Sequence, residues 1–331
     1  MTIYDIAKLA GVSASSVSRV INGKAGVNPQ KREEIQMLLE QYHYAPDENA
    51  RSLVTQTSHT IGILTDNIDA SRQNEGTTRI EYEMLRSGYF CFVKYIGTGP
   101  DAIEKGAADL AKRRVDGALF LGTSFRKKDE VTRAVYRYLK DTPVVLVHQT
   151  ERSELDNIYC VGADEKKGFI RCVDHMVSKG RKNLVLLLDE NRQSAAIIKD
   201  GFETGIRQHS QVRGWVYSGI TPTVDGGAQA VPKVLAEHPG IDGLICAQDL
   251  IAIGAINALQ DRGLHVPQDI SVMGEDNSAF CEVCRPKLTS MDTMLGMSTL
   301  MSARMLLDVL AGREQTRKIT LEMEIIERST T

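Results

Sequence analysis

The first apolar pattern in the chain is a short stripe at helical spacing. Ile6 and Leu9 are predicted to lie on one face of a helix. Thr2 and Asp5 precede this stripe with the three-residue spacing of a capping box, and Gly11 supplies a helix end. We therefore expect a short first helix between Thr2 and Gly11.

A second short helix is predicted directly afterwards, with Ser13 as its N-cap. Val17, Val20 and Ile21 have the i, i+3, i+4 spacing that turns side chains toward a core. The outward face then consists of small residues and one arginine, namely Ala14, Ser15, Ser18 and Arg19. Surface helices usually carry long charged side chains, whereas this face is small enough to lie against DNA.

Asn28 and Pro29 are a cap and first-turn signal for a third helix. Its inward stripe is predicted to comprise Ile35, Leu38, Leu39 and Tyr42. Two short helices joined by a tight glycine-containing turn and backed by a third form a helix-turn-helix, which can place its second helix in a major groove. The alternative is a three-helix packing module, which the small outer face of the second helix disfavours.

From Thr60 onward, continuous apolar runs alternate with amphipathic segments. The runs, which include residues 61–64, 143–147 and 184–188, are too continuous for half-exposed strands and indicate sheets covered on both faces. Helices are predicted near residues 101–114, 128–141, 165–179, 194–210, 225–238, 249–262 and 295–312. This rhythm is typical of parallel βαβ units and predicts an α/β fold with parallel sheets.

A short internal repeat indicates two lobes. The run Val115-Asp116-Gly117-Ala118-Leu119-Phe120 recurs as Ile241-Asp242-Gly243-Leu244-Ile245-Cys246, each time after a helix and at the start of a strand. Ligands of open α/β sheets bind at the carboxyl ends of the strands. The cleft between two lobes is therefore the expected ligand site.

Composition limits the partners that this chain can have. The 331 residues include 40 basic and 43 acidic side chains, so any contact with nucleic acid must come from a local patch. Residues 1–32 supply such a patch, because they hold five basic residues against one acid: Lys8, Arg19, Lys24, Lys31 and Arg32 against Asp5. Residues 33–58 reverse this balance, which a charge count over the whole region would miss.

No apolar run approaches the roughly 18 residues of a membrane span, and the first residues lack the apolar core of a signal peptide. We expect a cytoplasmic protein without membrane partners. Six scattered cysteines are too few for a disulfide scaffold, which fits a reducing compartment.

Four runs of residues in the first 53 positions carry a family resemblance. They are Ile3-Tyr4-Asp5-Ile6-Ala7-Lys8-Leu9-Ala10-Gly11-Val12-Ser13, Ser16-Val17-Ser18-Arg19-Val20-Ile21-Asn22, and Tyr44-Ala45-Pro46 with Ala50-Arg51-Ser52-Leu53. The chain resembles the lactose-repressor (LacI/GalR) family of bacterial transcription regulators. Framework motifs such as residues 249–254 and 263–274 extend the resemblance over nearly the whole chain.

The resemblance implies three domains. These are a helix-turn-helix DNA headpiece at residues 1–45, a hinge helix at 46–58 that orders on the operator, and an effector-binding and dimerisation core at 59–331 that is similar to periplasmic sugar-binding proteins. The core lobes are expected at 59–158 with 290–318 and at 159–289 with 319–328. Residues 319–331 are predicted to form a strand and a short polar tail without a heptad helix, so a homodimer is expected rather than a tetramer.

By the same resemblance, Ala14, Ser15 and Arg19 face base edges, with Arg19 placed for a bidentate contact to guanine. Ser13, Ser16 and Asn22 would hold phosphates of pseudo-palindromic double-stranded operator DNA. In the hinge, Leu53 would wedge into the minor groove, and Ala50 is small enough to let two hinge helices pair. Asp47 and Glu48 depart from the family, since carboxylates repel phosphates although they also favour a helix N-terminus.

The resemblance also implies an effector site between the lobes, lined by Asp66, Ser124, Asp164, Gln248 and Asp276. At the position where sugar-responsive members carry an arginine, this chain has Ile198, and residues 69–76 and 220–222 lack the expected aromatic side chains. Without an arginine fork and stacking faces, a small polar metabolite is expected, but an ordinary hexose is less secure as the effector.

Other chemistry is only weakly indicated. Cys281 and Cys284 have redox or metal spacing, but a single pair without nearby histidine cannot complete a zinc site. The loop at residues 97–102 formally meets a dinucleotide-binding pattern, yet Pro100 removes an amide donor from it. Glu275 and Asp276 are interpreted as strand-end effector contacts rather than as an acid–base pair. No cofactor, metal or catalytic residue is predicted.

Two classes of function remain open at this point. The first is a homodimeric, operator-binding transcriptional regulator, in particular a repressor, whose cleft senses a small metabolite. The second is a cytosolic ligand-binding protein or α/β enzyme with an unused headpiece. We favour the regulator and no enzymatic activity, because we find no phosphate loop, nucleophile elbow or metal cluster.

Overall fold

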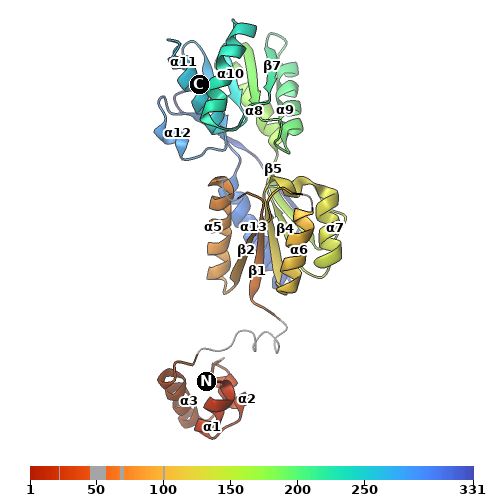
Figure 1. Ribbon diagram of the computed structural model, residues 1–331, viewed down its shortest axis with the longest axis vertical. Coiled ribbons are helices and arrows are strands. Elements are labelled where there is room, and N and C mark those ends of the chain that lie inside the picture. Colours follow the sequence, from red (N-terminus) through yellow and green to blue (C-terminus); the bar gives the residue numbers. More distant parts are fainter. Residues whose placement is uncertain (22, 45–56, 68–70, 100) are drawn as a thin grey trace. The chain divides into compact units, whose positions relative to one another are not determined.

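The computed structural model describes residues 1–21, 23–44, 57–67, 71–99 and 101–331. The chain divides into an N-terminal unit, Met1–His59, and a core, Thr60–Thr331, and each is described by itself (Figure 1). The described helices of the N-terminal unit are α1 (Ile3–Ala10), α2 (Ala14–Ile21) and α3 (Pro29–Gln41). They enclose a small apolar cluster that includes Ile6, Val17, Val20 and Ile35.

The helix ends in this unit follow the chemistry expected from the sequence. Thr2 and Asp5 form the predicted capping box, and Gly11 ends α1 in the left-handed conformation with φ 63°. Asn28 caps α3 by accepting a hydrogen bond from the backbone N–H of Gln30. The predicted inward stripes are wrong for Leu9 and Tyr42, which are 50% and 40% exposed. For Leu9 the reason is that α1 fills the small core with Ile6, Ala7 and Ala10.

The first sheet of the core is wholly parallel and defines lobe one. Its order is β11 (Lys318–Leu321), β5 (Ile158–Ala163), β4 (Val144–Val147), β3 (Gly117–Leu121), β1 (Thr60–Thr65) and β2 (Phe90–Tyr95). Helices α6 (Ala102–Lys112) and α7 (Lys128–Tyr138) cover one face, and α5 (Ser71–Arg86) and α13 (Leu295–Leu310) cover the other. A short 3₁₀ turn, Thr123–Arg126, follows β3.

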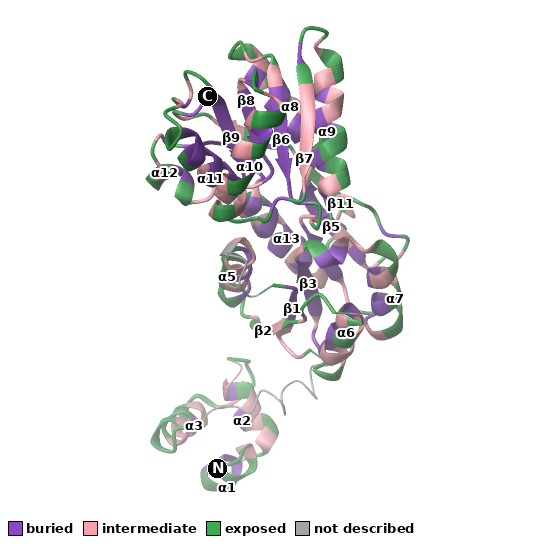
Figure 2. Ribbon diagram, turned by 45° about the horizontal axis from the view of Figure 1, so that its top comes forward, coloured by how far each residue is buried: buried purple, intermediate pink, exposed green. Residues whose placement is uncertain are grey.

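The second sheet defines lobe two and repeats this arrangement. Its order is β12 (Glu324–Ile326), β10 (Thr289–Asp292), β9 (Ser271–Glu275), β8 (Gly243–Cys246), β6 (Asn183–Leu188) and β7 (Arg213–Ser218), with only β12 antiparallel among them. Helices α8 (Glu165–Ser178) and α9 (Ala195–Gln208) pack on one face, and α10 (Val224–Glu237) and α11 (Asp249–Gln260) on the other. The short α12 (Phe280–Val283) completes it. Strands β6, β8 and β9 are buried along nearly their whole length, whereas the edge strand β7 is only partly buried (Figure 2).

The two sheets confirm the predicted α/β class and the internal repeat. Strand β3 lies between β1 and β4 in the first sheet, as β8 lies between β6 and β9 in the second. All seven predicted core helices are present, but α5 was not predicted. The prediction of a polar tail at the end of the sequence is wrong for Thr330. This residue is fully buried, and its carbonyl accepts a hydrogen bond from the backbone N–H of Val272.

The chain crosses between the lobes three times within the described core. The crossings lie at Asp164, between β5 and α8, at residues 293–294, between β10 and α13, and at residues 322–323, between β11 and β12. Strand β5 therefore keeps residues up to Ala163 in the first sheet, and β11 keeps residues up to Leu321 there. Both strands end a few residues beyond the limits of lobe one expected from the sequence, which were 158 and 318. Their ends are set by the pairing of β5 with β4 and β11, which the local sequence does not report.

Candidate functional site

The first candidate site is the outer face of α2. Ser13 accepts a hydrogen bond from the backbone N–H of Ser16 at 3.2 Å, which makes it the predicted N-cap of the helix. Val17 and Val20 are buried, whereas Ser15 and Arg19 are exposed, and Ala14 and Ser16 are partly exposed. The sequence therefore presents the predicted small-residue face with one arginine on it.

Arg19 has a second role in this unit. Its guanidinium donates a hydrogen bond to the carbonyl of Ala25 at 3.1 Å, and Arg32 on α3 donates to the neighbouring carbonyl of Lys24. Both arginines thus brace the same loop after α2. A guanidinium has five N–H donors, so the bond to Ala25 leaves Arg19 further donors for a ligand.

Three predicted DNA-contacting residues, Asn22, Ala50 and Leu53, lie outside the described residues, as do the two acidic hinge positions, Asp47 and Glu48.

The second candidate site lies where strands of the two core lobes end. Asp66 follows β1 and accepts a hydrogen bond from the backbone N–H of Ser124 at 2.6 Å, so the structure brings these two predicted residues together. The other carboxylate oxygen of Asp66, Oδ1, is buried without a partner among the described residues. An unsatisfied buried carboxylate oxygen is a ready acceptor for a ligand hydroxyl or amine.

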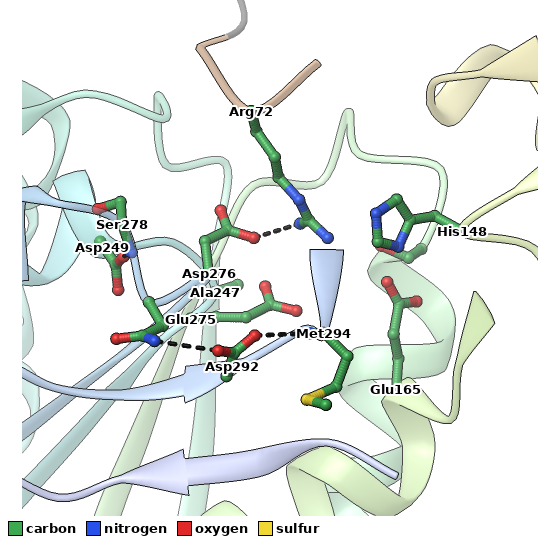
Figure 3. Close-up of polar contacts among 12 residues, drawn as sticks. Arg72, His148, Glu165, Ala247, Asp249, Glu275, Asp276, Ser278, Asp292 and Met294 are labelled. Carbon is green, nitrogen blue, oxygen red and sulfur yellow. Dashed lines mark hydrogen bonds and ion pairs between the residues drawn. The ribbon is translucent and has the colours of Figure 1, made fainter. Parts of the chain in front are cut away.

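Asp276 follows β9 in lobe two and forms an ion pair with Arg72 of α5 in lobe one (Figure 3). Gln248, the residue before α11, is half-buried. Its neighbour Asp249 accepts hydrogen bonds from the Ser278 N–H at 2.7 Å and the Ser290 hydroxyl at 2.6 Å, and burial raises the pKa of this carboxyl. Strand ends from both sheets therefore contribute polar groups to one region.

Two predicted effector residues are placed differently. Asp164 caps α8 by accepting from the Lys167 N–H at 3.1 Å, and it lines a hollow of about 390 Å³ beside the crossing at residues 322–323. Ile198 is wholly buried in the apolar cluster of lobe two with Phe202. An apolar side chain at this position of α9 packs into the core instead of facing a ligand.

A connected set of charged residues lies at the same strand ends and was not predicted from the sequence. Arg126, from the turn after β3, donates to both carboxylate oxygens of Glu165 at 2.9 Å. Arg192, from the loop after β6, contacts Glu165 at 3.4 Å and forms an ion pair with Glu275 at the end of β9. Arg192 thus supplies a guanidinium in lobe two despite isoleucine at position 198. Their positions just after strands were the signal that could have found both arginines.

Burial shapes the charge states in this set. It raises the pKa of Glu275 to about 7, although Arg192 opposes the shift. Burial alone would lower the pKa of Arg192, but Glu275 and Glu165 raise it above its ordinary value. Burial, together with Arg72, Arg126 and Arg192, holds the pKa of His148 well below its usual range, so this ring is neutral near pH 7.

The remaining candidates carry little chemistry. Burial raises the pKa of Cys281 to about 12 and also raises that of Cys284, so neither thiol is activated. Among the described residues, no group of three or more histidine, cysteine, aspartate or glutamate side chains is arranged to hold a metal ion. No described helix is long and apolar enough to cross a membrane.

Comparison with known proteins supports both parts of the chain. Residues 2–47 match the model of bacterial regulatory proteins of the lacI family, and residues 173–331 match a periplasmic binding protein-like domain. A protein named HTH-type transcriptional regulator from Lachnoclostridium phytofermentans is 27% identical, with 100% of this chain and 99% of that protein covered. The transcriptional repressor PurR of Haemophilus influenzae is 28% identical over 99% of this chain and 97% of its own length.

The fold also matches solved structures. The lac repressor dimer, determined bound to operator and the anti-inducer ONPF, has a TM-score of 0.89 and 22% sequence identity, covering 100% of this chain and 98% of that one.

A helix-turn-helix unit joined to a two-lobed, periplasmic-binding-protein-like core defines a DNA-binding transcriptional regulator with an effector-binding domain. The chain thus combines a region that matches the lacI family of bacterial regulatory proteins with a periplasmic binding protein-like domain.

Proposed function

We propose that this chain is a homodimeric, cytoplasmic repressor that joins the nucleoid when its α2 helices bind a pseudo-palindromic operator. A small polar metabolite between the core lobes controls this binding, and the chain catalyses no reaction. The observation that carries the proposal is the outer face of α2, where Ser15 and Arg19 are exposed while Val17 and Val20 are buried. Such a face fits a major groove because short side chains let the helix backbone approach base edges.

In this proposal Arg19 reads a guanine, Ala14 and Ser15 pack against neighbouring base edges, and Ser13 and Ser16 position the helix at phosphates. Asn22 adds a further phosphate contact. Ala50 and Leu53 are proposed to act at the centre of the operator, where two hinge helices meet and Leu53 opens a base step.

An apolar surface on lobe one supports the homodimer. Helices α5 and α13 contact each other, and α5 also contacts the edge strand β2. Large apolar side chains are exposed on these three elements, namely Tyr82 and Leu85, Phe90 and Tyr95, and Met297. Exposed apolar side chains gathered on neighbouring elements are typical of a surface that a partner covers.

The test is selection of duplexes from a random pool by the full-length protein. We expect enrichment of one pseudo-palindromic sequence. Arg19→Ala should relax the preference at one position in each half-site and weaken binding by about 1–3 kcal/mol, because a bidentate contact to guanine is lost.

The matched control is Arg32→Ala, which removes the same charge and a brace of the same loop from a different helix. It should weaken binding without changing the selected sequence. Identical effects of the two substitutions would show that Arg19 supports the loop and reads no base.

For the effector, we propose that Asp66, Ser124, Gln248 and Asp276 hold the ligand and that Asp164 acts from the crossing. Relatives of the same fold were determined with cellobiose and ribose bound, which makes these two sugars suitable first probes. A ligand that raises the unfolding temperature should also change operator affinity, and operator should change its affinity by the same factor. Equal operator affinity with and without a bound ligand would contradict control by the core.

A further inference from the structure

Two ion pairs join the core lobes directly. Arg72 of α5 in lobe one pairs with Asp276 after β9 in lobe two, 204 positions away in sequence (Figure 3). Arg126 of lobe one pairs with Glu165 at the start of α8, with both carboxylate oxygens bound at 2.9 Å. The side chains of the second pair are only 18% and 10% exposed, so water and salt screen it less than a surface pair.

Lobe two holds Glu165 ready for this contact. Arg192 contacts the Glu165 carboxylate at 3.4 Å and is itself fixed by Glu275, by the Ala247 carbonyl at 2.7 Å and by the Ser194 hydroxyl at 2.6 Å. Glu165 therefore lies between two guanidinium groups, one from each lobe. A bidentate pair whose carboxylate is already oriented loses little side-chain entropy when it forms.

The same contacts occupy groups proposed for the effector. Asp276 is engaged by Arg72, and Glu165 directly follows Asp164 at a crossing between the lobes. A ligand that hydrogen-bonds the Asp276 oxygen facing Arg72 must take the place of that guanidinium. Ion pairs across the lobes thus satisfy, within the protein, carboxylates that a bound ligand would otherwise satisfy.

We propose that Arg72–Asp276 and Arg126–Glu165 form an interlobe latch that holds the lobes together with no effector bound, and that the effector acts by displacing Arg72 from Asp276. The link to the effector rests on the proposed function, whereas closure by the ion pairs does not. The latch is a property of the ligand-free core, so it is measured without DNA or metabolite.

The experiment uses the full chain after unfolding and refolding, which removes metabolites carried over from expression. Spin labels are placed at exposed positions through Lys128→Cys on α7 of lobe one and Lys199→Cys on α9 of lobe two, and pulsed electron paramagnetic resonance measures their separation. We expect one narrow distance distribution. Combining Glu165→Gln with Asp276→Asn should broaden it and shift it to longer distances, because neither replacement carries the negative charge that forms an ion pair with a guanidinium.

Glu104→Gln is the matched control, since Glu104 pairs with Arg137 within lobe one at 2.7 Å. It should leave the distribution unchanged. Each of Arg72→Glu and Asp276→Lys alone should lengthen the distance between the spin labels. The two substitutions together exchange the charges of the first pair and should restore the short distance. Circular dichroism verifies that every variant is folded.

An unchanged distribution in the folded Glu165→Gln, Asp276→Asn variant would overturn the latch, and so would equal broadening by Glu104→Gln. Neither result bears on operator selection by the wild type. Failure of the wild type to select a duplex would instead remove the proposed function and leave the latch intact, so the two failures are distinguishable.

Discussion

Arg192 is a buried cation that pairs with two carboxylates of the core, Glu275 and Glu165. Its side chain is 9% exposed, and its partner Glu275 is 1% exposed. Removing one member of a buried ion pair leaves an uncompensated charge, which costs far more than the intact pair contributes. The stability of lobe two should therefore respond strongly to changes at this one position.

Arg192→Met keeps the bulk of the side chain but leaves Glu275 buried without its partner. We expect a loss of about 3–5 kcal/mol in the free energy of unfolding near pH 8, measured by urea denaturation. The loss should be largest at high pH and shrink as the pH falls toward 7, because Arg192 lowers the pKa of Glu275 in the wild type and the buried carboxyl of the variant therefore takes up a proton at a higher pH.

Arg313→Met is the matched control, since Arg313 pairs with Asp308 at the surface with 63% of its side chain exposed. It should cost at most about 1 kcal/mol. Equal losses in the two variants would contradict a special role for Arg192.

His148 gives a pH dependence of opposite sign. Burial and three arginines hold its pKa in the folded protein well below the ordinary value, so the unfolded chain takes up a proton at a higher pH than the folded one. This group's contribution to stability is therefore complete above the unfolded pKa, about 6.5, and is lost as the pH falls below it.

The difference in unfolding free energy between the wild type and His148→Gln isolates this effect. This difference should be constant above pH 7. Below pH 6 the wild type should lose stability relative to His148→Gln by up to about 1.4 kcal/mol per pH unit. A difference that stays flat down to pH 5 would show that His148 is protonated in the folded state.

At the scale of elements, the long apolar runs and regular amphipathic segments predicted the strands and seven helices of the core. Helix α5 was not predicted, because its sequence is mostly polar and its fully buried apolar residues are only Ile80 and Met84. Two apolar residues are too few to define a helical periodicity in the sequence. Gly76 faces Leu121 and Thr299 at close range, so the helix packs through a small residue rather than through a large apolar one.

The contact between α10 and α11 shows how closely two helices of lobe two approach. A Cβ atom on Gly254 would lie 1.9 Å from the Val224 carbonyl oxygen, and one on Gly227 would lie 2.0 Å from that of Ile251. Both obstacles are backbone atoms, which cannot move aside as a flexible side chain could. The two glycines therefore set the distance between these helices.

Gly254→Ala should destabilise the core by about 1–3 kcal/mol, because the helices must separate to admit one methyl group. Gly240→Ala serves as its control, since a Cβ there meets nothing within 4 Å and the backbone has no positive φ. That change should leave stability unaltered or slightly raised. Thermal unfolding measures both, and an unshifted midpoint in Gly254→Ala would contradict the packing described.

At the scale of the whole molecule, sequence patterns predicted the helix-turn-helix, the α/β class and the duplicated lobes. The pairing of Asp66 with Ser124 was anticipated only as two residues of one cleft. The charged set between the lobes was not anticipated, because Arg72 and Asp276 are 204 positions apart and no local pattern reports such a contact. The burial of Ile198 in the core of lobe two was not anticipated either, because a family position does not determine whether a changed side chain faces a ligand or the core.

The measurement that tests the central claim most directly is genome-wide footprinting of the full-length protein in its source cell, beside its Arg19→Ala variant. We expect discrete pseudo-palindromic sites for the wild type and their loss in the variant, since the exposed arginine of α2 supplies the base contact. Sites that persist unchanged in Arg19→Ala, or a wild type with no discrete sites, would contradict sequence-specific operator binding through this helix.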